Sequence, residues 1–363
     1  MKTEILKMLR EADGYLSGQQ LCEHLGVSRT AVWKIIGQLK AEGYRIEAVR
    51  NKGYHLVEGA DVITKAELLS CLETAWAGTE LVYYDNTDST NNRARQLAEE
   101  GAPHGTLVVA DSQTAGKGRR GRHWEAPSGT GVWMTLVLRP QIEPQRASMM
   151  TLVAALAVAE GIQKLTGLEA KIKWPNDIVC GGKKVCGILT EMSTEADWIR
   201  YVIIGIGINV NIDQFSQELE HTATSLKREL GHPVKRSTVI GAVMAAFETY
   251  YDIFLKTGDL SELRGTYNEL SANLGRPVKV LDPAGEYGGT ALGIDSQGAL
   301  LVQCSEGEVR SVISGEVSVR GIYGEADGLL FHLAEGVLVH AGKHFLHFRH
   351  VGTGEGKIGR GEQ

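Results

Sequence analysis

The chain has 363 residues, which is enough for two or three domains with well-buried cores, so a small scaffold held by disulfides or a metal is excluded. Its composition, 43% hydrophobic and 23% charged, is that of a soluble globular protein and excludes disordered and collagen-like chains. The net charge of -6 means that any contact with nucleic acid needs a local basic patch. Glycine is the outlier, with 44 residues where a usual chain would have roughly 25, and predicts many tight turns or close approaches of backbone to ligand.

Cysteine usage and apolar run lengths bear on the compartment. The cysteines are odd in number, scattered and without a CxxC pair, which argues against a disulfide framework or a zinc ribbon and fits reduced thiols in the cytoplasm. Residues 1–16 alternate apolar and charged positions at helical spacing, unlike a signal peptide. The longest apolar stretches fall well short of ~20 residues, so we expect no membrane span.

The first sixty residues predict three short helices followed by a hairpin. Ser17 and Gln20 form a capping box for the second helix, and Ser28 caps the third, in which apolar residues recur at i, i+3, i+4 and i+7 over 32–39. After Gly43 the period changes to two, which is typical of a β-hairpin. Helix, turn, capped helix and hairpin together predict a winged helix-turn-helix.

The third helix and the hairpin turn carry a basic face. Between residues 28 and 52 there are six basic and two acidic side chains, a local charge of +4 in an acidic protein, as DNA contact requires. The candidate DNA-binding residues are Ser28, Arg29, Thr30, Trp33, Lys34, Arg50 and Lys52. A protein-interaction module with a solvated basic face is the alternative, and Trp33 could instead belong to the core.

Two polar segments follow predicted strands in the central region. The strand at 81–84 ends in hydroxyl and amide side chains over 85–92, which can cap a helix or bind a polar ligand. The strand at 106–110 leads to 116–122, where four cations are interleaved with three glycines, followed by Trp124. Such a loop can approach a phosphate or carboxylate closely, although a solvated basic loop is the alternative, and it is not a Walker motif.

A second group of candidates lies around a predicted hairpin that turns at 181–182. Asp177 could ligate Mg²⁺ or orient an attacking amine, and Lys184 could neutralise an acyl phosphate as charge develops. Each residue alone also has a structural explanation: Asp177 as an aspartate in a turn, and Lys184 as an exposed lysine of the hairpin. Cys186 is interpreted as a small core residue, because no His or Asp pattern nearby supports activation as a nucleophile.

Several of these segments, in this order, resemble the motifs of the biotin protein ligases. The matching segments are Ser89-Thr90-Asn91, Gln113, Gly116 to Trp124, Lys173 to Asp177 and Lys183 to Leu189. With the N-terminal winged helix, residues 1–323 resemble the bifunctional members that also repress the biotin operon.

The resemblance implies an α+β multidomain fold. It comprises an N-terminal winged helix-turn-helix DNA-binding domain at 1–60 and a biotin- and ATP-binding domain at 61–272. The latter is a central mixed α/β catalytic domain similar to class II aminoacyl-tRNA synthetases. A small SH3-like β-barrel follows at 273–323, where short alternating segments meet Gly-rich turns.

The resemblance also implies the reaction. Biotin and MgATP give biotinyl-5′-AMP and pyrophosphate, and a lysine of a biotin carboxyl carrier protein domain then takes the biotin. The adenylate would also be the corepressor of a ligand-promoted homodimer on operator DNA, with the polar loop 212–225 ordering when it binds. The rivals are a lipoate-type ligase and a ligand-sensing regulator without catalysis. The basic loop before Trp124 argues against the first, and the complete motifs with Asp177 and Lys184 argue against the second.

Site residues are carried over position by position. The residues implied in catalysis are Lys184, Asp177 and Arg119, with Mg²⁺ entering with ATP near Asp177. The residues implied in binding biotin or its adenylate are Ser89, Thr90, Asn91, Gln113, Lys117, Gly118, Arg119, Arg122, Trp124, Asn176, Lys184 and Asn209. The family usually has Arg where Lys117 stands, which puts a bidentate side-chain role there in doubt.

The last 40 residues, 324–363, depart from the family pattern. They hold nine glycines and five of the chain's eleven histidines, without a clear helical period. We expect a poorly ordered extension, as a shifted or read-through reading frame would produce, rather than a metal site.

Overall fold

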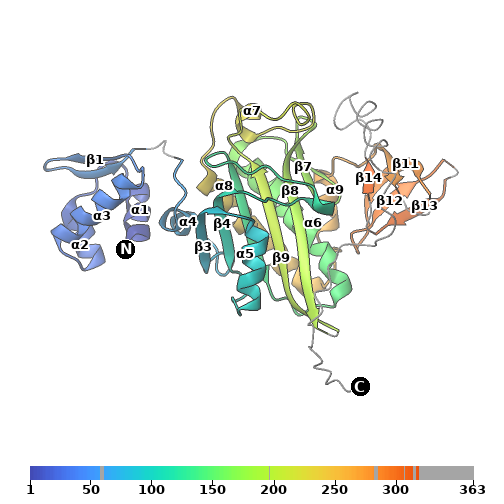
Figure 1. Cartoon of the computed structure of the whole chain (residues 1–363), viewed down its shortest axis with the longest axis horizontal. Helices are drawn as coiled ribbons and strands as arrows, with labels where there is room; N and C mark the ends of the chain where they lie inside the picture. Colours follow the sequence, from blue (N-terminus) through green and yellow to red (C-terminus); the bar gives the residue numbers. More distant parts are fainter. Residues whose placement is uncertain (58–60, 196, 282–284, 306, 314–315, 319–363) are drawn as a thin grey trace, which may run out of the picture.

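The computed structural model describes residues 1–57, 61–195, 197–281, 285–305, 307–313 and 316–318. It has three parts in a row (Figure 1): a small helical unit, a central sheet with its helices, and a second, smaller sheet. Residues 319–363, and with them the predicted tail at 324–363, lie outside the described residues.

The N-terminal unit has the helices and the hairpin that the capping and period signals predict. Its elements are α1 (Lys2–Glu11), α2 (Gly18–Leu25), α3 (Arg29–Ala41), β1 (Ile46–Val49) and β2 (Gly53–Leu56). The Ser17 hydroxyl accepts from the Gln20 amide and the Gln20 side chain accepts from the Ser17 amide, which confirms the capping box. The Ser28 hydroxyl accepts from the Ala31 amide at the start of α3. Leu6, Leu21 and Leu39 pack together at full burial, so the unit has a core of its own.

The central sheet has seven strands in the order β3-β4-β5-β9-β8-β7-β6. They are β3 (Leu81–Thr87), β4 (Leu107–Gln113), β5 (Gly131–Leu138), β6 (Lys171–Lys173), β7 (Asp177–Cys180), β8 (Lys183–Glu195) and β9 (Trp198–Asn209). Only the pair β3 and β4 is parallel among these strands. β3 runs three residues beyond the predicted 81–84, because Asn86 and Thr87 pair with the end of β4. The polar residues of both strands are thereby brought to one end of the sheet.

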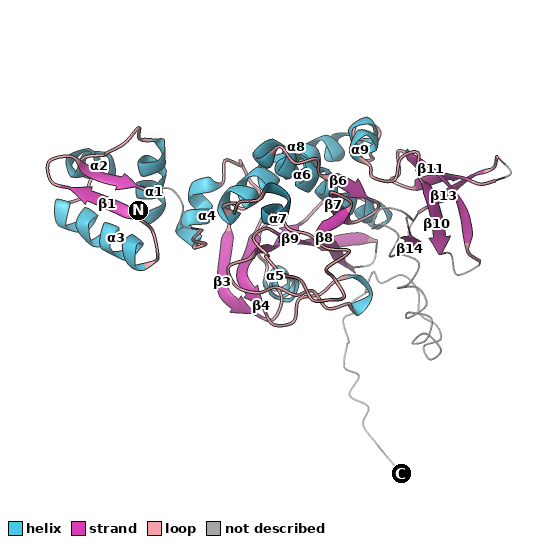
Figure 2. Cartoon of the chain, turned by 90° about the horizontal axis from the view of Figure 1, so that it is seen from above, coloured by secondary structure: helices cyan, strands magenta, loops and turns pink. Residues whose placement is uncertain are grey.

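Helices cover both faces of this sheet. The helices of the central part are α4 (Lys65–Cys71), α5 (Thr90–Glu99), α6 (Met149–Thr166), α7 (Leu226–Leu230), α8 (Arg236–Thr257) and α9 (Arg264–Leu270). Figure 2 shows α6 and α8 on one side of the strands and α5 on the other. Ala94 and Ala98 of α5 pack on Val108, Val137 and Ile203, so the sheet is buried on both faces there.

By length and composition, two helical segments, 144–166 (which includes α6) and α8, could cross a membrane. The apolar run lengths in the sequence did not indicate this. Most of the apolar window of each is nevertheless buried inside the protein, 67% in the first and 56% in α8. Both belong to the largest hydrophobic cluster, together with β5, β8 and β9, as expected for core helices of a folded domain.

The C-terminal sheet is antiparallel, in the order β13-β12-β11-β10-β14. Its strands are β10 (Pro277–Leu281), β11 (Tyr287–Ile294), β12 (Leu300–Gln303), β13 (Val309–Val312) and β14 (Glu316–Ser318). Strands therefore lie in the region 273–323 where short alternating segments were predicted. The indole of buried Trp174 donates to the Gly298 carbonyl at 3.0 Å, which ties this sheet to the central one.

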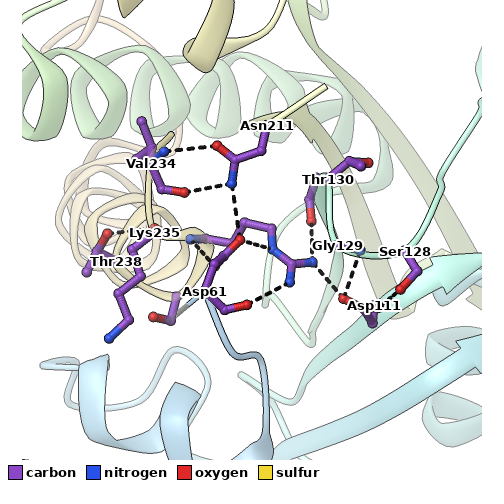
Figure 3. A network of polar contacts seen from close by, with 12 residues as sticks. Asp61, Asp111, Ser128, Gly129, Thr130, Asn211, Val234, Lys235 and Thr238 are labelled. Atoms are coloured by element: carbon purple, nitrogen blue, oxygen red, sulfur yellow. Dashed lines mark hydrogen bonds and ion pairs between the residues drawn. The ribbon is translucent and has the colours of Figure 1, made fainter. Parts of the chain in front are cut away.

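A buried arginine joins the segment after the N-terminal unit to the central sheet. Arg236, at the start of α8 and only 3% exposed, donates to Asp61 Oδ2 at 2.7 Å and to Asp111 Oδ1 at 2.6 Å. Figure 3 shows Asp61, Asn211 and Asp111 converging on this point, and Asn211 donates to Asp61 at 3.1 Å. Since Asp111 lies on β4 two residues before Gln113, the network ends next to the predicted site.

A second buried ion cluster lies at the same junction. Glu67 of α4 is fully buried and pairs with Arg10 of α1 and with Lys235, which precedes α8. Burial alone would raise the pKa of Glu67, but hydrogen bonds and charge from these cations and from Ser237 outweigh it and lower that pKa.

Candidate active site

A pocket opens on the face of the central sheet that carries α5. Its lining comes from the start of α5, the end of β4, the basic loop, and the strands β5, β8 and β9. Ten of the predicted site residues line it: Ser89, Thr90, Asn91, Gln113, Lys117, Gly118, Arg119, Trp124, Asn176 and Lys184. Residues that are up to 95 positions apart in the chain therefore meet in one cavity.

The floor of the pocket is made of glycines on β8 and β9. A Cβ at Gly207 would lie 2.9 Å from Trp124 Nε1, and a Cβ at Gly187 would lie 2.9 Å from Trp124 Cζ3. A Cβ at Gly205 would overlap the Asn91 side-chain oxygen. Gly205 and Gly207 line the pocket but were missed in the sequence, although glycine alternating with isoleucine over 204–208 was a visible signal.

Gln113 organises the start of α5. Its side-chain oxygen accepts from the Thr90 amide at 2.7 Å and lies 3.0 Å from the Thr90 hydroxyl. Within the described ranges, the Ser89 hydroxyl at the N-cap position makes no capping hydrogen bond. A side chain from β4 thus replaces the local cap, and both threonine and glutamine are held against the pocket.

Lys184, Asp177 and Trp124 form a polar and aromatic group at one wall. Lys184 Nζ lies 2.7 Å from Asp177 Oδ1 and 5.2 Å from the centre of the Trp124 ring. Asp177 is not in the lining but orients the lysine that is. The Trp124 indole nitrogen is buried and has no hydrogen-bond partner in the described part of the chain, so it is a donor available for a ligand.

The basic loop and its neighbours add further donors. Lys117 Nζ donates to Asn92 at 2.9 Å and Arg119 Nη1 donates to Asn176 at 2.9 Å. The Gly118 amide donates to the Arg122 carbonyl at 2.8 Å, so Arg122 belongs to this loop, but its side chain is exposed and outside the pocket lining. These cations give the pocket mouth a positive charge that suits an anionic ligand.

Asn209 and Lys184 both hold the loop 212–225. The Asn209 side chain donates to the Thr224 carbonyl at 3.1 Å, and it is buried outside the pocket lining. The Lys184 backbone pairs with Thr222 and Thr224, donating to one at 2.8 Å and accepting from the other at 2.9 Å. Any shift of this loop would therefore reach the Lys184 backbone directly.

Two further observations concern metal ligands and nucleophiles. Over the described residues, no group of three or more His, Cys, Asp or Glu is arranged to hold a metal ion. Cys186 is fully buried, and burial raises the pKa of its thiol far above neutral pH, so it stays a neutral core residue as predicted. The site can neutralise and position anions, which needs no covalent enzyme intermediate.

The candidate DNA-binding side chains are all exposed on the N-terminal unit. Arg29, Thr30 and Lys34 of α3 are exposed, and Trp33 is 70% exposed, so the tryptophan is not a core residue. The predicted turn residues Arg50 and Lys52 are also exposed, and Ser28 caps the helix. Exposed donors at the start of α3, the second helix of the helix-turn-helix, and on the hairpin turn suit binding to the grooves and backbone of duplex DNA.

Comparison with known proteins agrees across all three parts. Residues 83–209 match the biotin/lipoate A/B protein ligase family, residues 2–55 an HTH domain and residues 274–320 the biotin protein ligase C-terminal domain. The bifunctional ligase/repressor BirA of Bacillus subtilis is 41% identical over 322 residues, covering 88% of this chain and 98% of that protein. The corresponding Escherichia coli protein is 30% identical, covering 84% and 92%.

A solved structure shares the fold of the larger part of the chain. A biotin protein ligase from Aquifex aeolicus, in complex with biotin and ATP, superimposes with a TM-score of 0.59 and 32% identity. The match covers 67% of this chain and 99% of that one.

Proposed function

The chain belongs to the biotin protein ligase family, and from that premise we propose that it is a bifunctional ligase and transcriptional repressor. As a ligase it forms biotinyl-5′-AMP from biotin and ATP and transfers the biotin to a lysine of a carboxylase carrier protein. The observation that carries this assignment is that ten residues from separate ligase-like motifs meet in one pocket.

The first half-reaction joins two anions. A biotin carboxylate oxygen attacks the α-phosphorus of ATP, and pyrophosphate leaves. Lys184 is our candidate for holding the carboxylate and the α-phosphate together, since its ammonium lies in the pocket and Asp177 orients it at 2.7 Å. Arg119, positioned by Asn176, is our candidate for neutralising the remaining phosphate charge.

The other pocket residues are proposed to recognise the two ends of the adenylate. Ser89, Thr90 and Gln113, at the junction of α5 and β4, would bind the ureido group of biotin. Trp124 would contribute its ring and its unpartnered indole N–H beside the nucleotide. Backbone at Lys117 and Gly118 would close over the acyl chain, a role that does not depend on whether residue 117 is lysine or arginine.

The second half-reaction is aminolysis. The carrier lysine amine attacks the carbonyl carbon of the mixed anhydride, AMP leaves, and the amine loses its proton. The pocket must keep water away from the anhydride, and the loop 212–225, which pairs with Lys184, is our candidate for the cover.

Magnesium is proposed to enter as part of the MgATP substrate. Three or more metal-ligating side chains are not grouped anywhere in the described ranges, which suits an ion held mainly by phosphates. Asp177 is the carboxylate beside the pocket that could contact such an ion, although it is also engaged by Lys184.

Repression is proposed to use the same intermediate. Biotinyl-5′-AMP would promote homodimerisation, and the dimer would place two helix-turn-helix units on operator DNA through Arg29, Trp33, Lys34 and their neighbours. Unmodified carrier would consume the adenylate and so relieve repression.

Finer features of the architecture are also proposals. We assign residues 1–60 to the DNA-binding domain, 61–272 to the catalytic domain and 273–323 to a small SH3-like barrel. The catalytic domain would share its layout with class II aminoacyl-tRNA synthetases. A cytoplasmic location without a membrane contact is part of the proposal, and the five free cysteines support it.

Two experiments test the two activities separately. With biotin and MgATP but no carrier, the protein should release pyrophosphate and hold biotinyl-5′-AMP, and lipoate in place of biotin should give neither. Adenylation of lipoate alone would favour the rival ligase. A gel shift of operator DNA should tighten when biotinyl-5′-AMP is added, and binding that ignores the ligand would exclude the corepressor role.

A further inference from the structure

A fully buried threonine lies behind the pocket and contacts two of the residues in its lining. Thr135 on β5 is not part of the lining. Its hydroxyl oxygen lies 2.8 Å from Thr90 Oγ1 and 2.7 Å from Asn91 Oδ1. Because one hydroxyl carries a single proton, it can donate to only one of these two oxygens.

The amide of Asn91 decides which oxygen receives that proton. Asn91 Nδ2 lies 2.8 Å from a Glu191 carboxylate oxygen and 3.4 Å from the Leu189 carbonyl, and both of these groups only accept. The side-chain oxygen of Asn91 therefore faces Thr135 and is itself only an acceptor. Thr135 must donate to Asn91, and it can then only accept from Thr90.

The far end of the chain of contacts is fixed in the same way. The Thr90 backbone amide, which can only donate, lies 2.7 Å from Gln113 Oε1. That oxygen is an acceptor, and it also lies 3.0 Å from the Thr90 hydroxyl.

The row of oxygen–oxygen contacts from Gln113 to Asn91 has one proton fewer than it has contacts. Three contacts link the oxygens of Gln113, Thr90, Thr135 and Asn91, but only the two threonine hydroxyls supply protons. The Thr135 proton goes to Asn91, and we assign the Thr90 proton to the 2.8 Å contact with Thr135 rather than to the 3.0 Å contact with Gln113. The Thr90 and Gln113 oxygens then face each other as acceptors. A ligand that brings an N–H to this point supplies the missing donor.

The orientation of the Asn91 amide is fixed by residues outside the pocket. Glu191 is paired with Arg95 of α5 at 2.6 Å, which holds the carboxylate that orients Asn91. Gly205 on β9 leaves the space that the Asn91 side-chain oxygen occupies. Donation thus runs from Thr90 through Thr135 and Asn91 to the Glu191 carboxylate of this ion pair.

We propose that Thr135 is a positioning residue that sets ligand specificity: by accepting from Thr90, it turns an oxygen lone pair of Thr90 toward the pocket and selects a ligand with N–H groups. The inference rests on the proposed function, in which that ligand is the ureido group of biotin. It adds a residue that never touches the ligand but decides which polar group the site accepts.

The experiment compares Thr135→Val, which keeps the shape and removes the hydroxyl, with Thr135→Ser, which keeps the hydroxyl. In Thr135→Val the Thr90 proton turns to Gln113, so the KM for biotin should rise on the order of tenfold. The KM for ATP and kcat should stay near wild type, and Thr135→Ser should restore the KM for biotin. Thr151→Val is the matched control, because it breaks a threonine–threonine contact of 2.8 Å between α6 and Thr190, on the opposite face of the sheet.

A second readout tests the N–H requirement itself. The two biotin derivatives methylated at one ureido nitrogen are compared with biotin in wild type and in Thr135→Val. At least one derivative should be discriminated against by wild type, and less so by the variant. If the wild-type protein does not use biotin at all, the proposed function is wrong and the positioning role of Thr135 is wrong with it. If wild type is active but Thr135→Val has an unchanged KM for biotin, only the positioning role of Thr135 is overturned. The same holds if Thr135→Ser does not restore that KM.

Discussion

Replacing Arg236 by alanine should destabilise the protein strongly, because two carboxylates would lose their shared cation. The guanidinium is 3% exposed and contacts Asp61 at 2.7 Å and Asp111 at 2.6 Å. It also donates to the Asp61 carbonyl at 3.3 Å. The alanine variant leaves these acceptors without their partner while Asp111 remains largely covered.

The size of the effect follows from burial. Removing one partner of a buried ion pair costs ~3–5 kcal/mol, a large share of the ~5–15 kcal/mol that keeps a domain folded. At ~2–4 °C per kcal/mol for a domain of this size, the melting temperature should fall by roughly 6–20 °C.

The effect should also depend on pH in a defined direction. Burial would raise the pKa of Asp111, but hydrogen bonds from Ser128 and Arg236 outweigh it and lower that pKa. A carboxyl with a lowered folded pKa contributes stability above its unfolded pKa of about 3.9, and this is lost as pH falls through the folded pKa. The gap between wild type and Arg236→Ala should therefore be widest near pH 7 and shrink below pH ~4.

Thermal and urea unfolding at pH 7 and pH 3.5 measure both quantities. Lys164→Ala is the control, since Lys164 is 73% exposed in an i,i+4 pair with Glu160 whose loss costs roughly 0.3–0.5 kcal/mol. If Arg236→Ala melts within ~2 °C of wild type at pH 7, or the gap widens in acid, the reasoning about this network is refuted.

Three further predictions concern the site and the DNA face. Lys184→Ala should lower the rate of pyrophosphate release by ~10²–10³, since a preorganised charge is lost, and an unchanged rate would remove Lys184 from the mechanism. Lys34→Ala should weaken operator binding about equally across sequences and reduce the salt slope by ~1, as fluorescence anisotropy at several salt concentrations would show; an unchanged slope would place Lys34 off the DNA. Asp88 has its pKa lowered to about 2, because hydrogen bonds from Asn92 and the Ser89 backbone outweigh burial, so its contribution is present above pH ~4 and lost toward pH 2. The urea midpoint of Asp88→Asn should therefore lie below that of wild type at pH 7 and approach it at pH 2.5, and parallel midpoints would contradict this.

Local signals in the sequence predicted local structure well. The capping box at Ser17 and the cap at Ser28 act between residues three apart, so their chemistry can be read directly from the chain. The ordered motifs also named most of the pocket lining, because each motif places its polar residues at the end of a strand or the start of a helix.

The features that the sequence did not indicate are those made by distant residues. Gln113, at the end of β4 and 23 positions from Thr90, caps α5 in place of the adjacent Ser89. The contact of Arg236 with Asp61 spans 175 positions. Nothing in the sequence around Thr135 distinguishes it from other strand threonines, because its contacts with Thr90 and Asn91 form only in the fold.

The glycine excess illustrates the same limit. Glycines of the basic loop at 116–121 were expected to approach a ligand. Gly187, Gly205 and Gly207, however, are needed because Trp124 and Asn91 lie directly on β8 and β9. Their backbone has no positive φ, so turn geometry does not require glycine there, and the alternation with isoleucine over 204–208 is the signal that the sequence offers for Gly205 and Gly207.

Transfer of biotin to a carrier protein tests the central claim most directly. Purified protein, labelled biotin, MgATP and a biotin carboxyl carrier domain are incubated together, with a carrier whose target lysine is replaced by arginine as the control. The account predicts label on the intact carrier, at that lysine by mass spectrometry, and none on the arginine variant. An unlabelled carrier, under conditions where a known biotin ligase labels it, would contradict the account.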